Sequence, residues 1–196
     1  MPELPFPDPP LTDGVVALRA WAVADAADIA DCCQDPEIPR WTEVPSPYDE
    51  DDARAFIAKS EQARLAGDEL SLAVTDAESG ELVGAIGVRP GSTEGKADVG
   101  YWVAAPARRR GTAVRAVRLV SSWAFEALRA KRVQVATHPL NEASRRVALR
   151  AGFTLEGLSR NYQLRKGVWE DRVIFSLVPA DLESYTRGRS SDRTSS

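Results

Sequence analysis

The chain has 196 residues, of which 43% are apolar and 28% are charged, and it carries a formal net charge of −4. This length and composition predict an ordinary globular protein whose single domain buries a substantial core. They exclude a membrane-spanning helix, because no apolar stretch approaches the roughly 20 residues that crossing a bilayer requires.

The two ends of the chain differ in composition from its middle. Residues 1–13 contain five prolines and predict an extended lead-in, without the basic and apolar regions of a signal peptide. Residues 181–196 are polar and low in complexity, so we expect a disordered tail there. No linker or repeat interrupts residues 14–180, which we therefore expect to form one domain.

Apolar residues recur at helical and strand periods along residues 14–180. In chain order, we expect a strand at 15–21, a helix at 24–33, a proline-rich loop at 34–49, a helix at 49–66, strands at 70–75, 82–89 and 97–104, a helix at 111–130, a strand at 132–137, a helix at 142–151, and strands at 153–158 and 168–177. This order predicts an α/β (α+β) fold in which about four helices flank a mixed sheet of about seven strands.

The cysteine usage carries information about location. Cys32 and Cys33 are the only cysteines, and they are adjacent. Adjacent cysteines rarely bridge, and two of them form neither a disulfide framework nor a metal site. We therefore expect a cytoplasmic protein with no bound metal.

Charge is distributed unevenly between the two halves of the chain. Residues 1–98 contain 21 Asp and Glu against 7 Lys and Arg, whereas residues 99–196 contain 8 acidic and 18 basic residues. A basic half can bind nucleic acid or a phosphorylated ligand. The pI of about 5.2 and the absence of aromatic residues interleaved with the basic ones count against nucleic acid.

Three arginines stand directly before the predicted helix at 111–130. The stretch Arg108-Arg109-Arg110-Gly111-Thr112-Ala113 follows a predicted strand and opens that helix. N–H groups in the first turn of a helix have no internal partners, and the helix dipole adds positive potential. The pattern therefore predicts anion binding, although a solvated basic loop has the same composition. The Lys-Ser/Thr of a P-loop and the three-glycine dinucleotide motif are both absent.

Three motifs extend this interpretation. They are Asp-Val-Gly-Tyr-Trp-Val at 98–103, Arg-x-x-Gly-x-Ala at 108–113, and Asn141-x-x-Ser144 followed by Gly152-Phe153. Together, in this order and spacing, they resemble the GNAT N-acetyltransferases, and most closely the Rim-type branch named for ribosomal-protein N-terminal acetylation. The resemblance covers roughly residues 14–180 and implies a GNAT domain with a splayed strand pair in its central sheet.

The resemblance implies a site for acetyl-CoA. In the family, the loop at 108–113 wraps the pyrophosphate, and Val103 lies where two strands splay apart, so that its N–H would polarise the thioester carbonyl. Asn141 would bond the pantetheine arm. The residues implied to bind the donor are Trp102, Val103, Arg108, Arg109, Arg110, Gly111, Thr112, Ala113, Asn141, Ser144 and Arg145.

The resemblance also implies candidate catalytic residues. Asp98 matches the position of a carboxylate base in some GNATs, and its short side chain would act through water; a purely structural carboxylate is the alternative. His138 is a second candidate base. Many GNATs use a tyrosine as general acid where this chain has Ala148. The Rim-type branch has a serine instead, here Ser144, whose hydroxyl would hydrogen-bond the sulfur of coenzyme A unless it only caps the helix.

The amine acceptor is less well determined. Acidic residues of the N-terminal half would steer a cationic amine toward the thioester, although acids at a helix start give the same pattern. They are Glu43, Asp49, Glu50, Asp51 and Asp52. Trp41 and Tyr48 would line an acceptor pocket or fix the proline-rich loop, and Tyr162 is a further residue that could approach the acceptor.

We therefore predict an acyltransferase that moves an acetyl group from acetyl-CoA to a primary amine, on a protein N-terminus or a small molecule, by direct attack. One alternative is a different donor such as succinyl-CoA. Another is a CoA-binding regulatory protein without turnover, which the missing tyrosine keeps open. We expect no nucleic acid or membrane partner, and a monomer or homodimer.

Overall fold

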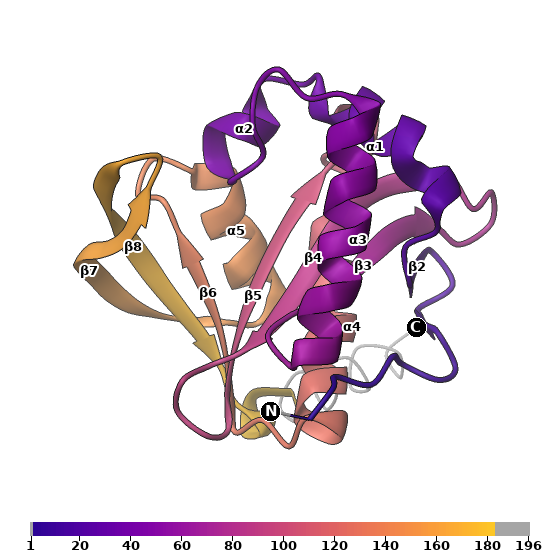
Figure 1. Ribbon diagram of the computed structural model, residues 1–196. Helices are drawn as coiled ribbons and strands as arrows, with labels where there is room; N and C mark the ends of the chain where they lie inside the picture. The colour runs from indigo at the N-terminus through magenta and orange to yellow at the C-terminus, as the bar shows by residue number, and fades with distance from the viewer. Residues whose placement is uncertain (1, 183–196) are drawn as a thin grey trace, which may run out of the picture.

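Eight strands form one mixed sheet in the order β1-β2-β3-β4-β5-β6-β8-β7 (Figure 1). The structure is a computed structural model that describes residues 2–182. The strands are β1 (Leu11–Thr12), β2 (Val16–Arg19), β3 (Leu70–Asp76), β4 (Leu82–Pro90), β5 (Lys96–Val103), β6 (Arg132–Thr137), β7 (Thr154–Arg165) and β8 (Val168–Leu177). The helices are α1 (Ala26–Cys33), α2 (Glu37–Trp41), α3 (Glu50–Ala66), α4 (Thr112–Ala127) and α5 (Glu142–Ala151), with single 3₁₀ turns at Val23–Asp25 and Ala105–Ala107. No helix within residues 2–182 is long and apolar enough to cross a membrane.

One strand pair in this sheet separates part-way along its length. β5 and β6 are parallel, and every other neighbouring pair is antiparallel. Their register runs from Lys96 opposite Arg132 only to Asp98 opposite Gln134, although β5 continues to Val103 and β6 to Thr137. The predicted splay is therefore present, and it opens directly after Asp98.

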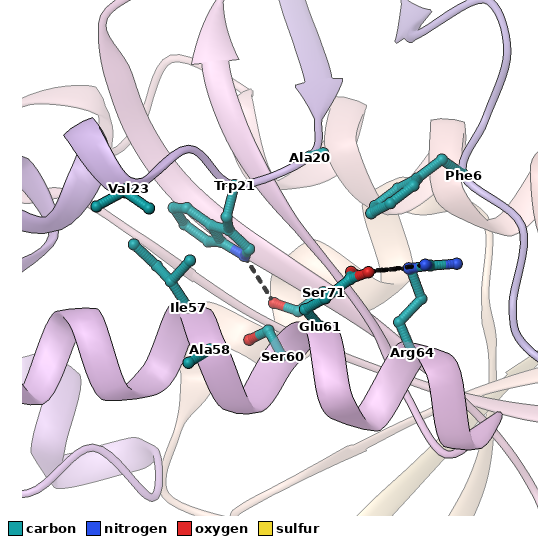
Figure 2. Close-up of a pocket in the computed structure, with 10 residues that line it drawn as sticks. All are labelled: Phe6, Ala20, Trp21, Val23, Ile57, Ala58, Ser60, Glu61, Arg64 and Ser71. Carbon is teal, nitrogen blue, oxygen red and sulfur yellow. Dashed lines mark hydrogen bonds and ion pairs between the residues drawn. The ribbon is translucent and has the colours of Figure 1, made fainter.

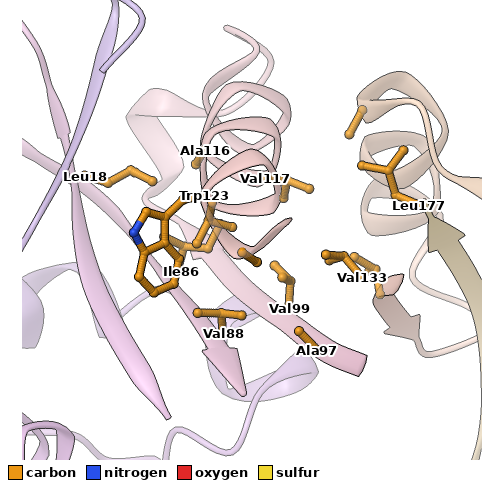
Figure 3. Packing of buried hydrophobic residues seen from close by; sticks show 14 of the residues in the cluster. Leu18, Ile86, Val88, Ala97, Val99, Ala116, Val117, Trp123, Val133 and Leu177 are labelled. Atoms are coloured by element: carbon orange, nitrogen blue, oxygen red, sulfur yellow. The ribbon is translucent and has the colours of Figure 1, made fainter. Parts of the chain in front are cut away.

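The main core lies between the sheet and α4. Buried residues recur along this helix at three- and four-residue spacing, as expected for a helix with one apolar face. They are Ala116, Val117, Val120, Trp123 and Ala124. Figure 3 shows Trp123 and Val117 packed over Ile86, Val88 and Val99 of β4 and β5. Burying each such side chain stabilises the fold by about 1.5–3 kcal/mol, and the packing fixes α4 against β4 and β5.

The opposite face of the sheet is covered by α1 and α3. Ala73 and Leu82 pack there with Ile29, Ile38 and Tyr48 in a second, smaller cluster. Figure 1 shows α3 crossing in front of the sheet while α4 lies behind it. The two clusters make a three-layer domain, with the sheet between two layers of helices.

Local capping explains where two of the helices begin and end. At the start of α3, Asp49 Oδ1 accepts from the N–H of Asp52 (2.9 Å), and Asp52 Oδ2 accepts from the N–H of Asp49 (3.1 Å). This reciprocal pair is a capping box. α3 ends at Gly67 and α5 at Gly152, both with a positive φ, a backbone conformation that glycine adopts at least cost.

The structure also differs from the predicted elements in several places. The predicted proline-rich loop contains a short helix, α2. At its start, Asp35 Oδ1 accepts a hydrogen bond from the N–H of Glu37 (3.0 Å). β7 continues to Arg165, seven residues beyond the predicted end at 158. The prediction stopped early because bulges between Leu155 and Gly157, and again after Ser159, interrupt the alternation that marks a strand. α4 ends at Ala127, three residues before the predicted end.

Both ends of the chain were assigned from composition. The lead-in contributes the short strand β1 and the buried side chain of Leu4, whose N–H donates to Arg64 O (3.0 Å). Of the predicted tail at 181–196, all but the first two residues lie outside the described part of the chain.

Candidate active site

The backbone of β5 presents unpaired amides at the splay. Ala104 N–H donates to Val83 O (2.9 Å) across the β4–β5 pair. Antiparallel partners alternate between hydrogen-bonded and non-hydrogen-bonded pairs, so the next pair, Gly84 and Val103, is non-hydrogen-bonded. The N–H groups of Val103 and, two residues earlier, Tyr101 therefore point toward β6, which has already diverged. The Val103 N–H is therefore accessible from the splay, and its role toward a thioester stays a prediction.

The loop at 108–113 opens α4 with two residues in the left-handed region. Arg109 has φ 62° and Gly111 has φ 85°. Thr112 Oγ1 donates to Ala107 O (3.0 Å), which closes the loop, and Arg115 N–H donates to Gly111 O (3.0 Å). The amides of the first helical turn precede Arg115 and so have no acceptor inside the helix. Such amides are suited to an anion, and binding of one here stays a prediction.

The three arginines of this loop differ in their contacts. Arg108 donates from Nε to Val103 O (3.0 Å) and forms an ion pair with Asp35. Arg109 and Arg110 are exposed. Arg108 therefore joins the loop to the end of β5 and to the segment between α1 and α2, whereas the other two side chains face solvent beside the helix start.

The first turn of α5 brings Asn141 and Ser144 to the other side of the splay. Asn141 Oδ1 accepts from the N–H of Ser144 (3.0 Å) and caps the helix. The hydroxyls of Ser144 and Tyr101 lie 2.8 Å apart. Arg145 Nη1 donates to Pro139 O (3.4 Å). Ser144 therefore takes part in two contacts: its N–H bonds the capping residue Asn141, and its hydroxyl contacts Tyr101 of β5.

Tyr101 is a site residue that sequence reasoning missed. It points to the face covered by α4, like Ala97 and Val99, and burial raises its pKa to about 12 although the hydrogen bond with Ser144 opposes that shift. A tyrosine at an inward position of a strand needs a partner for its hydroxyl. This requirement could have marked Tyr101 as a candidate in the sequence, but it does not identify the residue that its hydroxyl bonds.

Asp98 lies on the opposite face of β5, because successive side chains of a strand alternate. Its Oδ1 accepts from Gln134 Nε2 (3.0 Å), and the same amide group donates to Tyr162 Oη (2.8 Å). Burial raises the pKa of Asp98, against the opposing effects of Arg89 and the Gln134 bond. Burial and the Asp98 charge likewise raise the pKa of Tyr162. The structure brings Asp98 together with Tyr162, and not with Ser144.

The proline-rich segment reaches across to the β7–β8 hairpin. Lys166 Nζ donates to Pro39 O (2.8 Å), and Arg165 Nη1 donates to Thr42 O (3.3 Å). The segment also places Trp41 against His138, with ring centroids 5.4 Å apart. Residues on the two sides of the splay are therefore connected at its open end.

His138 is poorly arranged to act as a base. Its Nδ1 accepts from the N–H of Leu140 (3.1 Å). Burial is the largest cause of its lowered pKa, and nearby arginines contribute in the same direction. A lowered pKa favours the neutral ring that a base requires, but the Nδ1 lone pair that would accept a proton is already occupied.

The candidate acceptor acids divide into two groups. Arg54 pairs with Glu50 (2.5 Å) and Asp51 (3.1 Å), and Asp49 and Asp52 form the capping box, so all four have partners at the start of α3. Glu43 instead contacts Gln163 Nε2 (3.4 Å) on β7. Tyr48 is buried in the smaller cluster. Among the residues described here, Glu43 therefore contacts β7, and the neighbouring Trp41 contacts His138 directly after β6.

Two pockets lie outside the splay itself. One, of about 340 Å³, is lined by Phe6, Trp21, Ile57 and Arg64 (Figure 2) and contains none of the predicted site residues. The other, of about 360 Å³, lies between the loop after β5 and the β3–β4 turn, and Asp35 and Arg110 line it. Within residues 2–182, no group of three or more His, Cys, Asp or Glu side chains is arranged to hold a metal ion.

Comparison with known proteins decides the family. A family model described as an acetyltransferase (GNAT) domain matches residues 16–154, more than half of the chain. The chain belongs to the GNAT acetyltransferase family. The GNAT resemblance predicted from the three motifs is therefore confirmed.

Relatives of this GNAT chain carry N-acetyltransferase names. The p20 protein of Bacillus licheniformis, named as an uncharacterized N-acetyltransferase, is 27% identical over 164 residues, which cover 83% of this chain and 92% of that protein. YjcK of Bacillus subtilis, named as a probable N-acetyltransferase, is 35% identical over 85 residues, or 43% of this chain. The chain matches only 47% of the length of YjcK.

Solved structures agree with the Rim-type resemblance. A Vibrio cholerae structure that carries a provisional name as a ribosomal-protein-serine acetyltransferase superposes with a TM-score of 0.80 and 25% identity, over 89% of this chain and all of that one. RimJ of Mycobacterium smegmatis, solved with CoA-disulfide, gives a TM-score of 0.77 and 24% identity over 88% of this chain and 87% of its own. The second likeness supports the fold alone.

Proposed function

We propose that this protein transfers the acetyl group of acetyl-CoA to a primary amine. The observation that carries the proposal is the splay itself. It leaves the Val103 amide without a strand partner, and the loop after β5 leads to a helix start at Gly111 that has no side-chain cap. Thioester and pyrophosphate are the two parts of acetyl-CoA that need such groups, the first an N–H donor and the second several amides with positive potential.

The residues present fit the donor. Gly111 has a positive φ, and a Cβ added there would meet nothing closer than Arg115 Nε at 3.9 Å, so the space above the amide is open. The first-turn amides of Gly111, Thr112 and Ala113 would bind the pyrophosphate, with Arg109 and Arg110 adding charge. The side-chain amide of Asn141, whose oxygen caps α5, retains an N–H₂ group for a pantetheine carbonyl.

The transfer needs three functions from the chain. The neutral amine nitrogen attacks the thioester carbon, a C–N bond forms, and the oxygen becomes an oxyanion that the Val103 N–H stabilises. The C–S bond then breaks, and the electron pair leaves on sulfur, to which Ser144 would donate a hydrogen bond. Asp98 would accept the amine proton through water. Holding both reactants side by side contributes the remaining rate enhancement.

The acceptor would enter from the face that carries Asp98. That face holds Tyr162 and Gln134, and the α2 segment with Glu43 and Trp41 lies at its edge. Carboxylates there favour a cationic amine on approach. We therefore propose a protein N-terminus or a small primary amine as the acceptor.

Thiol release measured with each donor tests this proposal. The protein is incubated with acetyl-CoA or succinyl-CoA and a panel of amines that includes short peptides with free N-termini. We expect turnover with acetyl-CoA and at least one amine. Turnover with succinyl-CoA alone would contradict acetyl-CoA as the donor. CoA binding without turnover on any amine would contradict the enzymatic proposal.

A further inference from the structure

We infer that Tyr101 is a positioning residue that holds the Ser144 hydroxyl as a hydrogen-bond donor toward the departing sulfur. The inference rests on the proposed acetyl transfer and adds a residue to it. Tyr101 comes from β5 and Ser144 from the first turn of α5, so the contact joins one strand of the splayed pair to the helix that follows the other.

The distances select one pattern of hydrogen bonds between these two residues. Tyr101 Oη lies 2.8 Å from Ser144 Oγ and 3.3 Å from the carbonyl oxygen of Ser144. That carbonyl is already an acceptor within α5, where each carbonyl bonds the amide four residues later. The shorter contact to the hydroxyl oxygen is therefore the principal bond.

The direction of this bond follows from acidity. A phenol is a much stronger acid than an aliphatic alcohol and is the better donor of the two. Tyr101 stays protonated, since burial raises its pKa to about 12, and among the residues described only Ser144 accepts a hydrogen bond from its hydroxyl. Tyr101 therefore donates, Ser144 accepts, and the Ser144 proton remains available.

This pattern changes what a serine in a helix ordinarily does. A helical serine hydroxyl usually donates back to the carbonyl four residues earlier. The bond from Tyr101 occupies one lone pair of Ser144 Oγ and polarises its O–H, because hydrogen bonds in a chain strengthen one another. A polarised hydroxyl held beside the splay stabilises a thiolate better than it stabilises a thioester, so the effect appears in the transition state.

A double-mutant cycle tests the inference. Tyr101→Phe removes only the hydroxyl and keeps the ring that packs in the core. We expect kcat to fall about five- to tenfold, with the Kd for acetyl-CoA changed less than twofold, because one hydrogen bond is lost in the transition state. Ser144→Ala should lower kcat further, and the double variant should match Ser144→Ala alone.

A purely structural role for Tyr101 predicts a different result. Losses that multiply in the double variant, or a Tyr101→Phe enzyme with unchanged kcat, would overturn the inference. Ser121→Ala is the matched control, because it removes another fully buried hydroxyl from α4. Its oxygen has no hydrogen-bond partner among the described residues, so the substitution should leave kcat and the Kd for acetyl-CoA unchanged.

A binding measurement separates failure of this inference from failure of the proposed function. The thiol pKa of coenzyme A bound to the protein can be followed by the ultraviolet absorbance of the thiolate, without any amine. We expect the bound thiol to have a lower pKa than free coenzyme A, and Tyr101→Phe and Ser144→Ala each to raise it. An unshifted thiol in all three proteins would overturn the role of Tyr101 even if the wild-type protein transfers acetyl groups.

Discussion

Arg108 donates a hydrogen bond from Nε to the carbonyl oxygen of Val103 at 3.0 Å, and the same guanidinium forms an ion pair with Asp35. The peptide group that contains this carbonyl is held on its other side as well, because the N–H of Ala104 donates to Val83 O. Val103 is the residue whose own N–H faces the splay. The position of that N–H therefore depends on Asp35, a residue between α1 and α2.

Asp35→Asn tests this dependence. The substitution removes the charge that holds the Arg108 guanidinium, so we expect the Val103 carbonyl to lose its fixed position and kcat to fall about tenfold. This expected loss is smaller than the roughly hundredfold or larger loss that follows removal of an oxyanion donor, because here the donor stays in place but is less firmly held. The Kd for acetyl-CoA, measured by titration calorimetry, should stay the same or decrease, because the freed Arg108 adds positive charge to the loop.

Asp31→Asn is the matched control for that variant. Asp31 lines the same 360 Å³ pocket as Asp35 and has no ion pair among the described residues. It should leave both kcat and Kd within about twofold. If Asp31→Asn and Asp35→Asn behave alike, the effect belongs to the general charge of the pocket and not to the Arg108 contact.

Gly111→Glu should abolish donor binding. A glutamate places a negative side chain where the pyrophosphate would lie, and a non-glycine residue at φ 85° adds backbone strain. We expect the Kd for coenzyme A to rise at least a hundredfold. Gly14→Glu is the control for strain, because Gly14 has φ 84° with open space around it and lies outside the loop. Unchanged affinity in Gly111→Glu would contradict the assignment of this helix start.

Features with a local cause could be predicted from the sequence. The start of α3 near Asp49, the helix start at Gly111 and the apolar stripe of α4 all depend on residues within a few positions of one another. Residue type and spacing are enough to specify such features. The splayed strand pair was predicted from the family resemblance of the three motifs, because no local sequence rule indicates it.

Contacts between distant residues could not be predicted in this way. Tyr101 and Ser144 are 43 residues apart, and Asp98 and Gln134 are 36 apart. Their meeting depends on how far α5 is displaced along β5 and on the register of a parallel strand pair, and one sequence specifies neither. The contacts of Arg108 could not be predicted for the same reason. Its charge grouped it with Arg109 and Arg110, whereas its ion-pair partner Asp35 lies on another segment of the chain.

Asp98→Asn tests the role of the carboxylate as base. A base works only when deprotonated, and burial raises the pKa of Asp98. The kcat/KM for the neutral form of the amine should therefore fall on acidification, at a pH above the range of an ordinary aspartate. We expect Asp98→Asn to lower this kcat/KM about ten- to a hundredfold and to remove the acidic limb of the profile. An unchanged profile would make Asp98 a structural partner of Gln134 only.

Glu170→Gln should weaken the fold in a pH-dependent way. Glu170 pairs with Arg165 and Arg172 at 2.7 Å each, and these bonds lower its pKa to about 2. A carboxyl whose folded-state pKa is depressed contributes stability above its ordinary pKa of about 4.5 and loses that contribution as the pH falls toward 2. The variant should lose about 3 kcal/mol near pH 7, since Arg172 is left buried without its charged partner.

The difference between variant and wild type should shrink as the pH falls from about 4.5 to about 2, because protonation removes the same charge from the wild-type protein. Urea unfolding at a series of pH values measures both quantities. Glu142→Gln, which removes an exposed pair with Arg146, is the control and should change stability by less than about 0.5 kcal/mol. A constant difference between Glu170→Gln and wild type at every pH would show that packing, and not the ion pairs, links β8 to the end of β7.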